Sequence, residues 1–97
     1  MTVARVYIMH ARTGQGSALQ SALEALIASV RQLKGNEGVE FLRDRGNSER
    51  FIFIEKWATE EDHHAALAGP KPAGLDAVLA ASDGPPKGAY FDYVRIA

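Results

Sequence analysis

The side chains best suited to chemistry gather at one strand-to-helix junction in the middle of the chain. Glu55 can accept a proton, Trp57 can stack on a planar ligand, and His63 carries an imidazole that titrates near neutral pH. Strand alternation places Glu55 and Trp57 on the same face as Phe51 and Phe53. An acid, three aromatic rings and a histidine therefore meet at this junction, and we expect any functional site to lie there.

The elements on either side of the junction are predicted from residue type. The stretch 51–57 is aromatic and β-branched up to Ile54, which is typical of a strand, and its second face carries Ile52, Ile54 and Lys56. Two apolar faces indicate a strand in the middle of a sheet. Thr59 can cap a following helix whose first turn is acidic, as the helix dipole favours.

Metal and cofactor sites are not predicted. The chain has no cysteine, which removes thiolate nucleophiles, thiolate metal ligands and disulfides. His63 and His64 are adjacent, so on a helix they point about 100° apart and cannot both face one ligand well. Gly14-x-Gly16 lacks the third glycine of a dinucleotide-binding loop, because Leu19 stands there. We therefore expect no bound metal, flavin or haem.

Composition is that of an ordinary globular protein, and residues 1–97 are expected to form one domain. The chain is 46% hydrophobic and 24% charged. A net charge of −1 argues against a nucleic-acid or anionic-membrane surface, because those partners select for a basic patch. No apolar run reaches the length of a membrane span, and Arg5, His10 and Arg12 interrupt any signal-peptide core. Together with the lack of cysteine, this predicts a cytoplasmic protein.

The apolar pattern predicts the order strand, helix, strand, strand, helix, strand, with the second helix in two pieces. The clearest element is the first helix, where Ser17 and Gln20 have the spacing of a capping box and the leucines trace one stripe. This order is that of a ferredoxin-like βαββαβ fold of the α+β class, with helices on one face of an antiparallel sheet. The predicted strands are 2–12, 39–45, 51–57 and 89–96, and the predicted helices are 17–34, 59–68 and 71–82, with Pro72 in the first turn of the last.

The second face of such a sheet predicts an oligomer. The helices suffice to cover one face, and the other face would expose more apolar surface than a soluble monomer tolerates. A homodimer that packs sheet against sheet removes this exposure.

The junction also carries a resemblance to a known family. The segment FIEKW at 53–57 is followed by an acidic helix start, and Glu37-Gly38 opens the preceding strand. In these residues, and in length and element order, the chain resembles the antibiotic biosynthesis monooxygenase (ABM) family of dimeric α+β barrels. The most specific part is Glu55-x-Trp57. The resemblance implies one of the family's activities: cofactor-independent quinone-forming oxygenation, haem degradation or isomerisation of a signalling molecule; many other members have no known role.

The chain departs from the family at several functional positions. Quinone-forming members carry an asparagine four residues before the strand tryptophan, where this chain has Phe53. Many members have a histidine nine residues after that tryptophan, where this chain has Ala66, and haem-degrading members use a tryptophan at about that place. A second family histidine falls near Lys71. The scaffold of the family therefore matches better than its catalytic set.

Two strand residues are candidates for a catalytic site. Trp57 is the candidate for stacking on a planar aromatic substrate, and the alternative is a large core ring at the end of the strand. Glu55 is a candidate base, because burial would raise its pKa and let it take a proton from a phenol. The alternative for Glu55 is an ion pair with an arginine, such as Arg5 or Arg43, across a dimer.

The histidines and the remaining aromatic residues complete the candidate set. His63 lies three residues before Ala66, on nearly the same helix face, and is the candidate substitute acid–base group; otherwise it is a solvated helix residue. His64 is expected to face solvent and His10 to lie at the rim of the sheet. Four further residues are predicted to line the substrate cavity or to be plain core: Tyr7, Phe41, Phe53 and Tyr93.

Three functions follow as hypotheses. The first is an ABM-type monooxygenase that oxidises a small aromatic or quinol-like substrate with O2 and uses no cofactor. The second is a non-catalytic small-ligand-binding or stress-related dimer, favoured by the missing asparagine and histidine. The third, a haem-degrading enzyme, is opposed by Ala66 and by the lack of an axial histidine.

Overall fold

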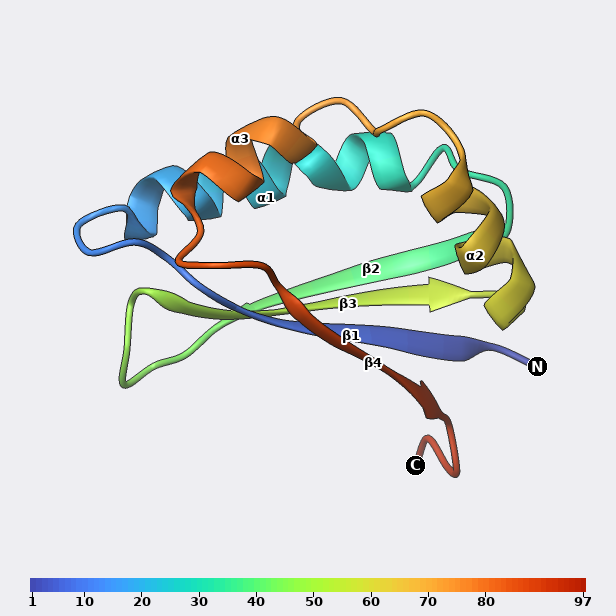
Figure 1. Cartoon of the computed structure of the whole chain (residues 1–97). Coiled ribbons are helices and arrows are strands. Elements are labelled where there is room, and N and C mark those ends of the chain that lie inside the picture. The colour runs from blue at the N-terminus through green and yellow to red at the C-terminus, as the bar shows by residue number, and fades with distance from the viewer.

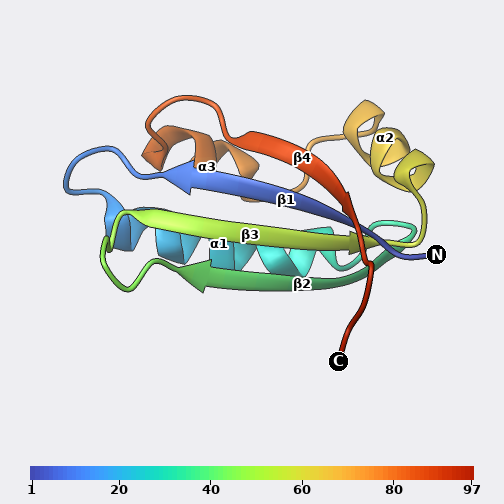
Figure 2. The same cartoon turned by 90° about the horizontal axis from the view of Figure 1, so that it is seen from below.

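The computed structural model describes all residues, 1–97, as a four-stranded antiparallel sheet with three helices over one face (Figure 1). The strand order is β2-β3-β1-β4, so that the strand carrying the candidate residues is central, as predicted. Figure 2 shows this order from the uncovered side. The elements are β1 (Val3–His10), α1 (Gly16–Val30), β2 (Asn36–Arg43), β3 (Arg50–Trp57), α2 (Glu60–Ala68), α3 (Leu75–Ala81) and β4 (Lys87–Asp92).

This architecture is the predicted ferredoxin-like α+β fold. The hairpin β2–β3 turns through residues 44–49, and β1 pairs with β3 on one side and with β4 on the other. The pairing places Arg5 opposite both Glu55 and Tyr90, so these three residues share one row on the helix-covered face. The register therefore brings the charged pair and a tyrosine of β4 to one place.

The core lies between the covered face of the sheet and the helices. The side chains of β3 alternate as predicted, so that Phe51, Phe53, Glu55 and Trp57 are buried. The apolar stripe of α1 packs on them, and α3 adds Val78. The buried residues of α1 are Leu19, Leu23, Leu26 and Val30.

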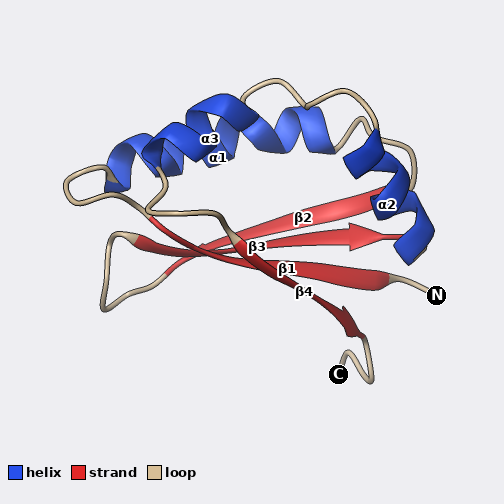
Figure 3. Ribbon diagram, viewed as in Figure 1, coloured by secondary structure: helices blue, strands red, loops and turns tan.

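The opposite face of the sheet is bare in this single chain. No helix lies on that side in Figure 3. Ile8, Leu42 and Phe91 are 37%, 49% and 54% exposed there, beside the half-buried Ile52 and Ile54. Apolar side chains thus line the surface through which a homodimer is expected to form.

The first helix begins and ends differently from the prediction. Helix α1 starts at Gly16 with Gln15 as its cap residue and no side-chain cap bond, so the predicted capping box of Ser17 and Gln20 is wrong. Ser17 is already inside the first turn. The helix also ends at Val30, because the next residues form tighter bonds, with Leu33 N–H donating to the Val30 carbonyl oxygen.

Other boundaries shift for reasons of pairing and backbone geometry. Strand β2 begins at Asn36 with a bulge before Gly38, since both pair with the end of β3. Strand β4 ends at Asp92, because Asp92 pairs with Val3, the first residue of β1. Helix α3 begins only at Leu75, so that Pro72 is outside it: Gly74 has φ +95°, which no α-helix accommodates.

No helix of the chain is both long and apolar enough to cross a membrane.

Candidate functional site

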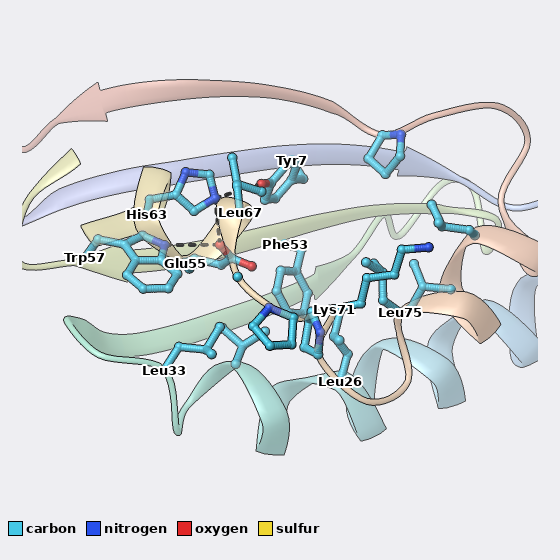
Figure 4. A pocket seen from close by; sticks show the side chains of 18 of the residues that line it. Tyr7, Leu26, Leu33, Phe53, Glu55, Trp57, His63, Leu67, Lys71 and Leu75 are labelled. Atoms are coloured by element: carbon cyan, nitrogen blue, oxygen red, sulfur yellow. Dashed lines mark hydrogen bonds and ion pairs between the residues drawn. The ribbon is translucent and has the colours of Figure 1, made fainter. Parts of the chain in front are cut away.

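A cavity of about 250 Å³ lies between the sheet, α1 and the segment that runs from α2 into α3. Its wall is largely apolar; three of its polar side chains gather at the end formed by β1, β3 and α2, and Lys71 lies on the segment between α2 and α3 (Figure 4). The polar end contains Tyr7, Glu55 and His63, next to the ring of Trp57. The apolar part is built from helix and loop residues that include Leu26, Val30, Leu33, Leu75, Val78 and Pro72.

The strand-to-helix junction places His63 over the polar end. The Thr59 hydroxyl accepts a hydrogen bond from the Asp62 N–H at 3.1 Å, which caps α2 as predicted and fixes where the helix begins. His63 then lies about one turn into α2, and its ring centroid is 5.3 Å from that of Trp57. His63 is only 2% exposed, so the interpretation of a solvated helix residue is wrong.

Glu55 connects the tryptophan and the histidine. The Trp57 indole Nε1–H donates to Glu55 Oε1 at 3.1 Å, and the same oxygen is 3.7 Å from His63 Nε2. Glu55 is 7% exposed. The carboxylate is therefore held within its own chain by the indole and the imidazole.

Two tyrosines flank the imidazole ring. The Tyr7 hydroxyl is 3.1 Å from His63 Nε2, and the Tyr90 hydroxyl is 2.6 Å from His63 Nδ1. Both ring nitrogens thus have a hydroxyl partner. The guanidinium carbon of Arg5 lies 5.1 Å from the ring centre of Tyr7 and 4.4 Å from that of Tyr90, so that a cation covers both rings.

Burial shifts the ionisation of these groups. Burial raises the pKa of Glu55, although the Trp57 hydrogen bond and the Arg5 charge act in the opposite direction. Burial also lowers the pKa of His63 to about 4, and the positive charges of Arg5 and His64 add to this effect. Burial, together with the charge of Glu55, raises the pKa of Tyr7. At neutral pH the site therefore holds a neutral imidazole and a neutral phenol beside a carboxyl group whose pKa is raised by burial.

Close packing on β4 makes room for the cluster. Gly88 pairs with Tyr7 across the sheet, and a Cβ at Gly88 would lie 2.6 Å from an Arg5 guanidinium nitrogen and 2.7 Å from the Tyr7 ring. Any side chain at this position would therefore displace Arg5 or Tyr7. Glycine at this position lets both side chains stay against the sheet.

The structure brings together most, but not all, of the residues proposed from sequence. Trp57, Glu55 and His63 line one cavity together with Tyr7 and Phe53. Phe41 does not line it, because its ring packs on Phe51 and Phe53 in the core, with centroids 5.5 and 5.9 Å away. Tyr93 does not line it either: it follows the end of β4, beside Lys56 on the far side of the sheet.

The positions that depart from the family, and the two other histidines, also have clear places in the structure. Ala66 and Lys71, which stand where family members carry histidines, both line the cavity. His64 is exposed and lies 3.2 Å from Glu60, and His10 is exposed at the end of β1. No group of three or more histidine, aspartate or glutamate side chains is arranged to hold a metal ion.

Sequence reasoning missed Tyr90. Tyr90 falls in the predicted strand 89–96, but its contact with His63 depends on how β4 pairs with β1 and on where α2 lies. The signal available was alternation, which puts Tyr90 and Asp92 on one face of the last strand. Only the register shows that this face is the covered one.

Comparison of the sequence with models of known families identifies the family of this chain. The family model for antibiotic biosynthesis monooxygenases matches residues 1–72, and the chain therefore belongs to the ABM family. No curated protein sequence matches the chain.

Solved structures share the fold over the whole chain. SnoaB, a cofactor-independent oxygenase from Streptomyces nogalater, has a TM-score of 0.85 at 20% identity, with 98% of this chain and 95% of SnoaB covered. Rv0793 from Mycobacterium tuberculosis has a TM-score of 0.79 at 17% identity, with coverage of 100% and 99%. PA3566 from Pseudomonas aeruginosa has a TM-score of 0.76 at 20% identity, with coverage of 97% and 95%. At these identities the likeness establishes the fold.

Proposed function

We propose that this protein is a cofactor-independent monooxygenase of the ABM type, which acts as a homodimer and oxidises a small aromatic or quinol-like substrate with O2. The observation that carries the proposal is the convergence of Trp57, Glu55 and His63 on one apolar cavity. SnoaB, described as a cofactor-independent oxygenase, has the same fold.

The cavity suits a flat, mainly apolar ligand with an oxygen atom at one end. Its volume of about 250 Å³ is below the roughly 300–1,000 Å³ usual for drug-sized ligands. A molecule of two or three fused rings is therefore the expected size class. The ring of Trp57 offers a stacking surface, and the polar groups beside it offer hydrogen bonds to a phenol or carbonyl oxygen.

In the proposed reaction the first step is loss of a proton. The substrate proton passes to the pair formed by Glu55 and His63, of which the carboxylate is the acceptor because the neutral imidazole has a pKa of about 4. The apolar wall excludes water and keeps the resulting anion close to O2. The protein thus supplies deprotonation, orientation and dryness.

The following steps balance without a cofactor. The substrate anion gives one electron to O2, and the substrate radical and superoxide then combine to form a carbon–oxygen bond. The peroxide anion takes a proton back from the acid–base pair. The O–O bond breaks as the remaining hydrogen on that carbon leaves as a proton, so that the products are a carbonyl group and water. One atom of O2 ends in the product and the other in water.

A second function is favoured by two specific residues. Phe53, at the place of the family asparagine, is fully buried and offers no hydrogen bond, and Ala66 lines the cavity where many members have a histidine. A protein with these residues that binds its ligand without turnover would be a small-ligand-binding dimer.

Isotope labelling separates the two functions. Anthrone is incubated with the purified protein under 18O2, and the anthraquinone formed is analysed by mass spectrometry. The monooxygenase proposal predicts protein-dependent product carrying one 18O atom. Saturable binding of anthrone without product above the protein-free rate would instead support the binding function.

A further inference from the structure

The two tyrosines on His63 cannot play the same role. A neutral imidazole has one N–H donor and one acceptor nitrogen, so that one ring nitrogen donates while the other accepts. Tyr90 contacts Nδ1 at 2.6 Å and Tyr7 contacts Nε2 at 3.1 Å. One tyrosine must therefore donate its proton to the ring, and the other must accept from it.

The charges around the ring decide the direction. Glu55 Oε1 is 3.7 Å from Nε2, and a carboxylate oxygen favours an N–H over a lone pair at that distance. Arg5 lies over both tyrosine rings, 5.1 Å from the centre of Tyr7 and 4.4 Å from that of Tyr90, and its charge opposes the rise in the pKa of each, so the direction follows from Glu55. The other charged groups are on α2, where His64 and Glu60 pair with each other near Tyr90 on the outer side. The proton of His63 therefore belongs on Nε2.

A directed chain of hydrogen bonds follows. The Tyr90 hydroxyl donates to Nδ1, and the Nε2–H of His63 points toward the Tyr7 oxygen and Glu55. Tyr7 then accepts from the imidazole, and its own proton is free. Because Tyr7 lines the cavity, its hydroxyl group can donate this proton to an acceptor in the cavity.

We propose that Tyr7 is the hydrogen-bond donor to an oxygen atom of the ligand, and that Tyr90 is a positioning residue that sets this donor through His63. The ligand class is an aromatic molecule with a phenol, enol or carbonyl oxygen. Hydrogen bonds that follow one another in one direction polarise each other, so that the donor at the end of the chain is strengthened.

In the proposed oxygenase reaction this donor would act on the charge that develops. This part rests on the proposed function. When the substrate loses its proton to Glu55, negative charge appears on the substrate oxygen, and a donor at that position stabilises it. Tyr7 keeps its proton, because burial raises its pKa whether or not Glu55 carries a charge.

Ligand binding tests the donor without any turnover. The probes are 1,4-naphthoquinone, which has carbonyl oxygens, and naphthalene, which has none, each titrated against the fluorescence of the single tryptophan, Trp57. Tyr7→Phe should weaken naphthoquinone binding by about three- to tenfold, the range for one hydrogen bond, and leave naphthalene binding unchanged. Tyr93→Phe, the same change outside the cavity, should alter neither. Equal affinities of wild type and Tyr7→Phe for naphthoquinone would overturn the proposal.

Nitrogen NMR of histidine tests the direction of the chain. In protein labelled with 15N-histidine at pH 7, His63 should show a protonated Nε2 and an unprotonated Nδ1, whereas the exposed His10 and His64 serve as internal references. Tyr90→Phe should leave the fold intact, yet give a mixture of both tautomers of His63 and a smaller preference for naphthoquinone over naphthalene. A protonated Nδ1 in the wild type would contradict the proposal.

The two proposals can fail separately. If Tyr7→Phe loses the preference for naphthoquinone and the wild type consumes no O2 with any quinol, the proposal that Tyr7 donates to the ligand is supported and the proposal of oxygenase activity is contradicted. If the wild type shows oxygenase activity and Tyr7→Phe keeps the preference for naphthoquinone over naphthalene, the oxygenase proposal is supported and the proposal about Tyr7 is contradicted.

Discussion

The indole N–H of Trp57 donates to the carboxylate of Glu55, although the two residues are only two positions apart on β3. Side chains at positions i and i+2 of a strand share a face, so the backbone itself brings the pair together. The bond fixes the edge of the indole and one oxygen of the carboxylate. Recognition of an aromatic ligand and acceptance of its proton are therefore expected to depend on each other at this site.

Removing the indole should remove ligand binding. Trp57 is 1% exposed and forms part of the cavity wall, so Trp57→Ala should abolish measurable binding of anthrone and cost about 3–5 kcal/mol of stability. Trp57→Phe keeps a ring but loses the N–H, and it should stay folded and bind anthrone more weakly. Isothermal titration calorimetry measures both affinities. Wild-type affinity in a folded Trp57→Ala protein would contradict a stacking role.

Removing the proton acceptor should lower turnover without abolishing binding. Glu55→Gln keeps an oxygen that can accept from the Trp57 indole, but it cannot take a proton from the substrate. We expect anthrone binding within about threefold of wild type and a turnover rate lower by about 10²–10⁴, the usual contribution of a general base. Glu24→Gln, at an exposed position of α1 away from both the cavity and the bare face of the sheet, is the matched control. A Glu55→Gln protein as fast as this control would exclude Glu55 as the base.

The buried imidazole should make stability depend on pH. The pKa of His63 falls from 6.5 to about 4 in the fold, so between these values the unfolded chain binds a proton that the folded chain does not. The stability due to His63 is complete above pH 6.5 and is lost as the pH falls toward 4. Glu55 acts in the opposite sense, since its raised pKa lets the folded chain bind more protons.

A neutral replacement separates these two effects. Between pH 7 and pH 5 the wild type should lose about 2 kcal/mol of unfolding free energy relative to His63→Gln, which retains Glu55. Urea unfolding at a series of pH values measures this difference. A constant difference over that range would show that His63 is not held neutral.

The bare face of the sheet should be a dimer interface. Ile54 is half-buried at the centre of that face, flanked by Val6 on β1 and by Glu40 on β2. We expect a homodimer by light scattering at micromolar concentration, and a monomer for Ile54→Glu, because a carboxylate in an apolar interface lacks a partner. Ala28→Glu, which adds the same charge on the exposed side of α1, should remain a dimer. A compact wild-type monomer would refute this interface.

The fold could be predicted because its determinants are local. Alternation along β3, the leucine stripe of α1 and the Thr59 cap each act within a few residues, and the structure has all three. The capping box at Ser17 is wrong because its spacing is necessary but not sufficient. The predicted helix 71–82, with Pro72 in its first turn, begins only at Leu75, because the positive φ of Gly74 is incompatible with an α-helix. The sequence carries no sign of that φ.

The site could be predicted only in part because it depends on long-range pairing. The approach of Trp57 and His63 follows from one junction, where the chain leaves β3 and enters α2 directly. The Tyr90 contact needs the register of β4 on β1 and the lie of α2, neither of which is encoded in a short segment. Tyr93 was misplaced for the same reason, since β4 ends where its partner strand begins.

Oxygen consumption by wild type and His63→Ala tests the central claim most directly. Each protein is mixed with anthrone and, separately, with 1-naphthol, a phenol with a hydrogen on the carbon opposite its hydroxyl group, in an oxygen electrode, and the spontaneous rate without protein is subtracted. Protein-dependent O2 uptake by the wild type is expected with at least one of the two. His63→Ala should bind these molecules while consuming O2 at least about tenfold more slowly, because the imidazole that positions Glu55 and Tyr7 is lost. Equal rates for the two proteins would contradict the role of His63, and no protein-dependent uptake with either molecule would contradict the oxygenase.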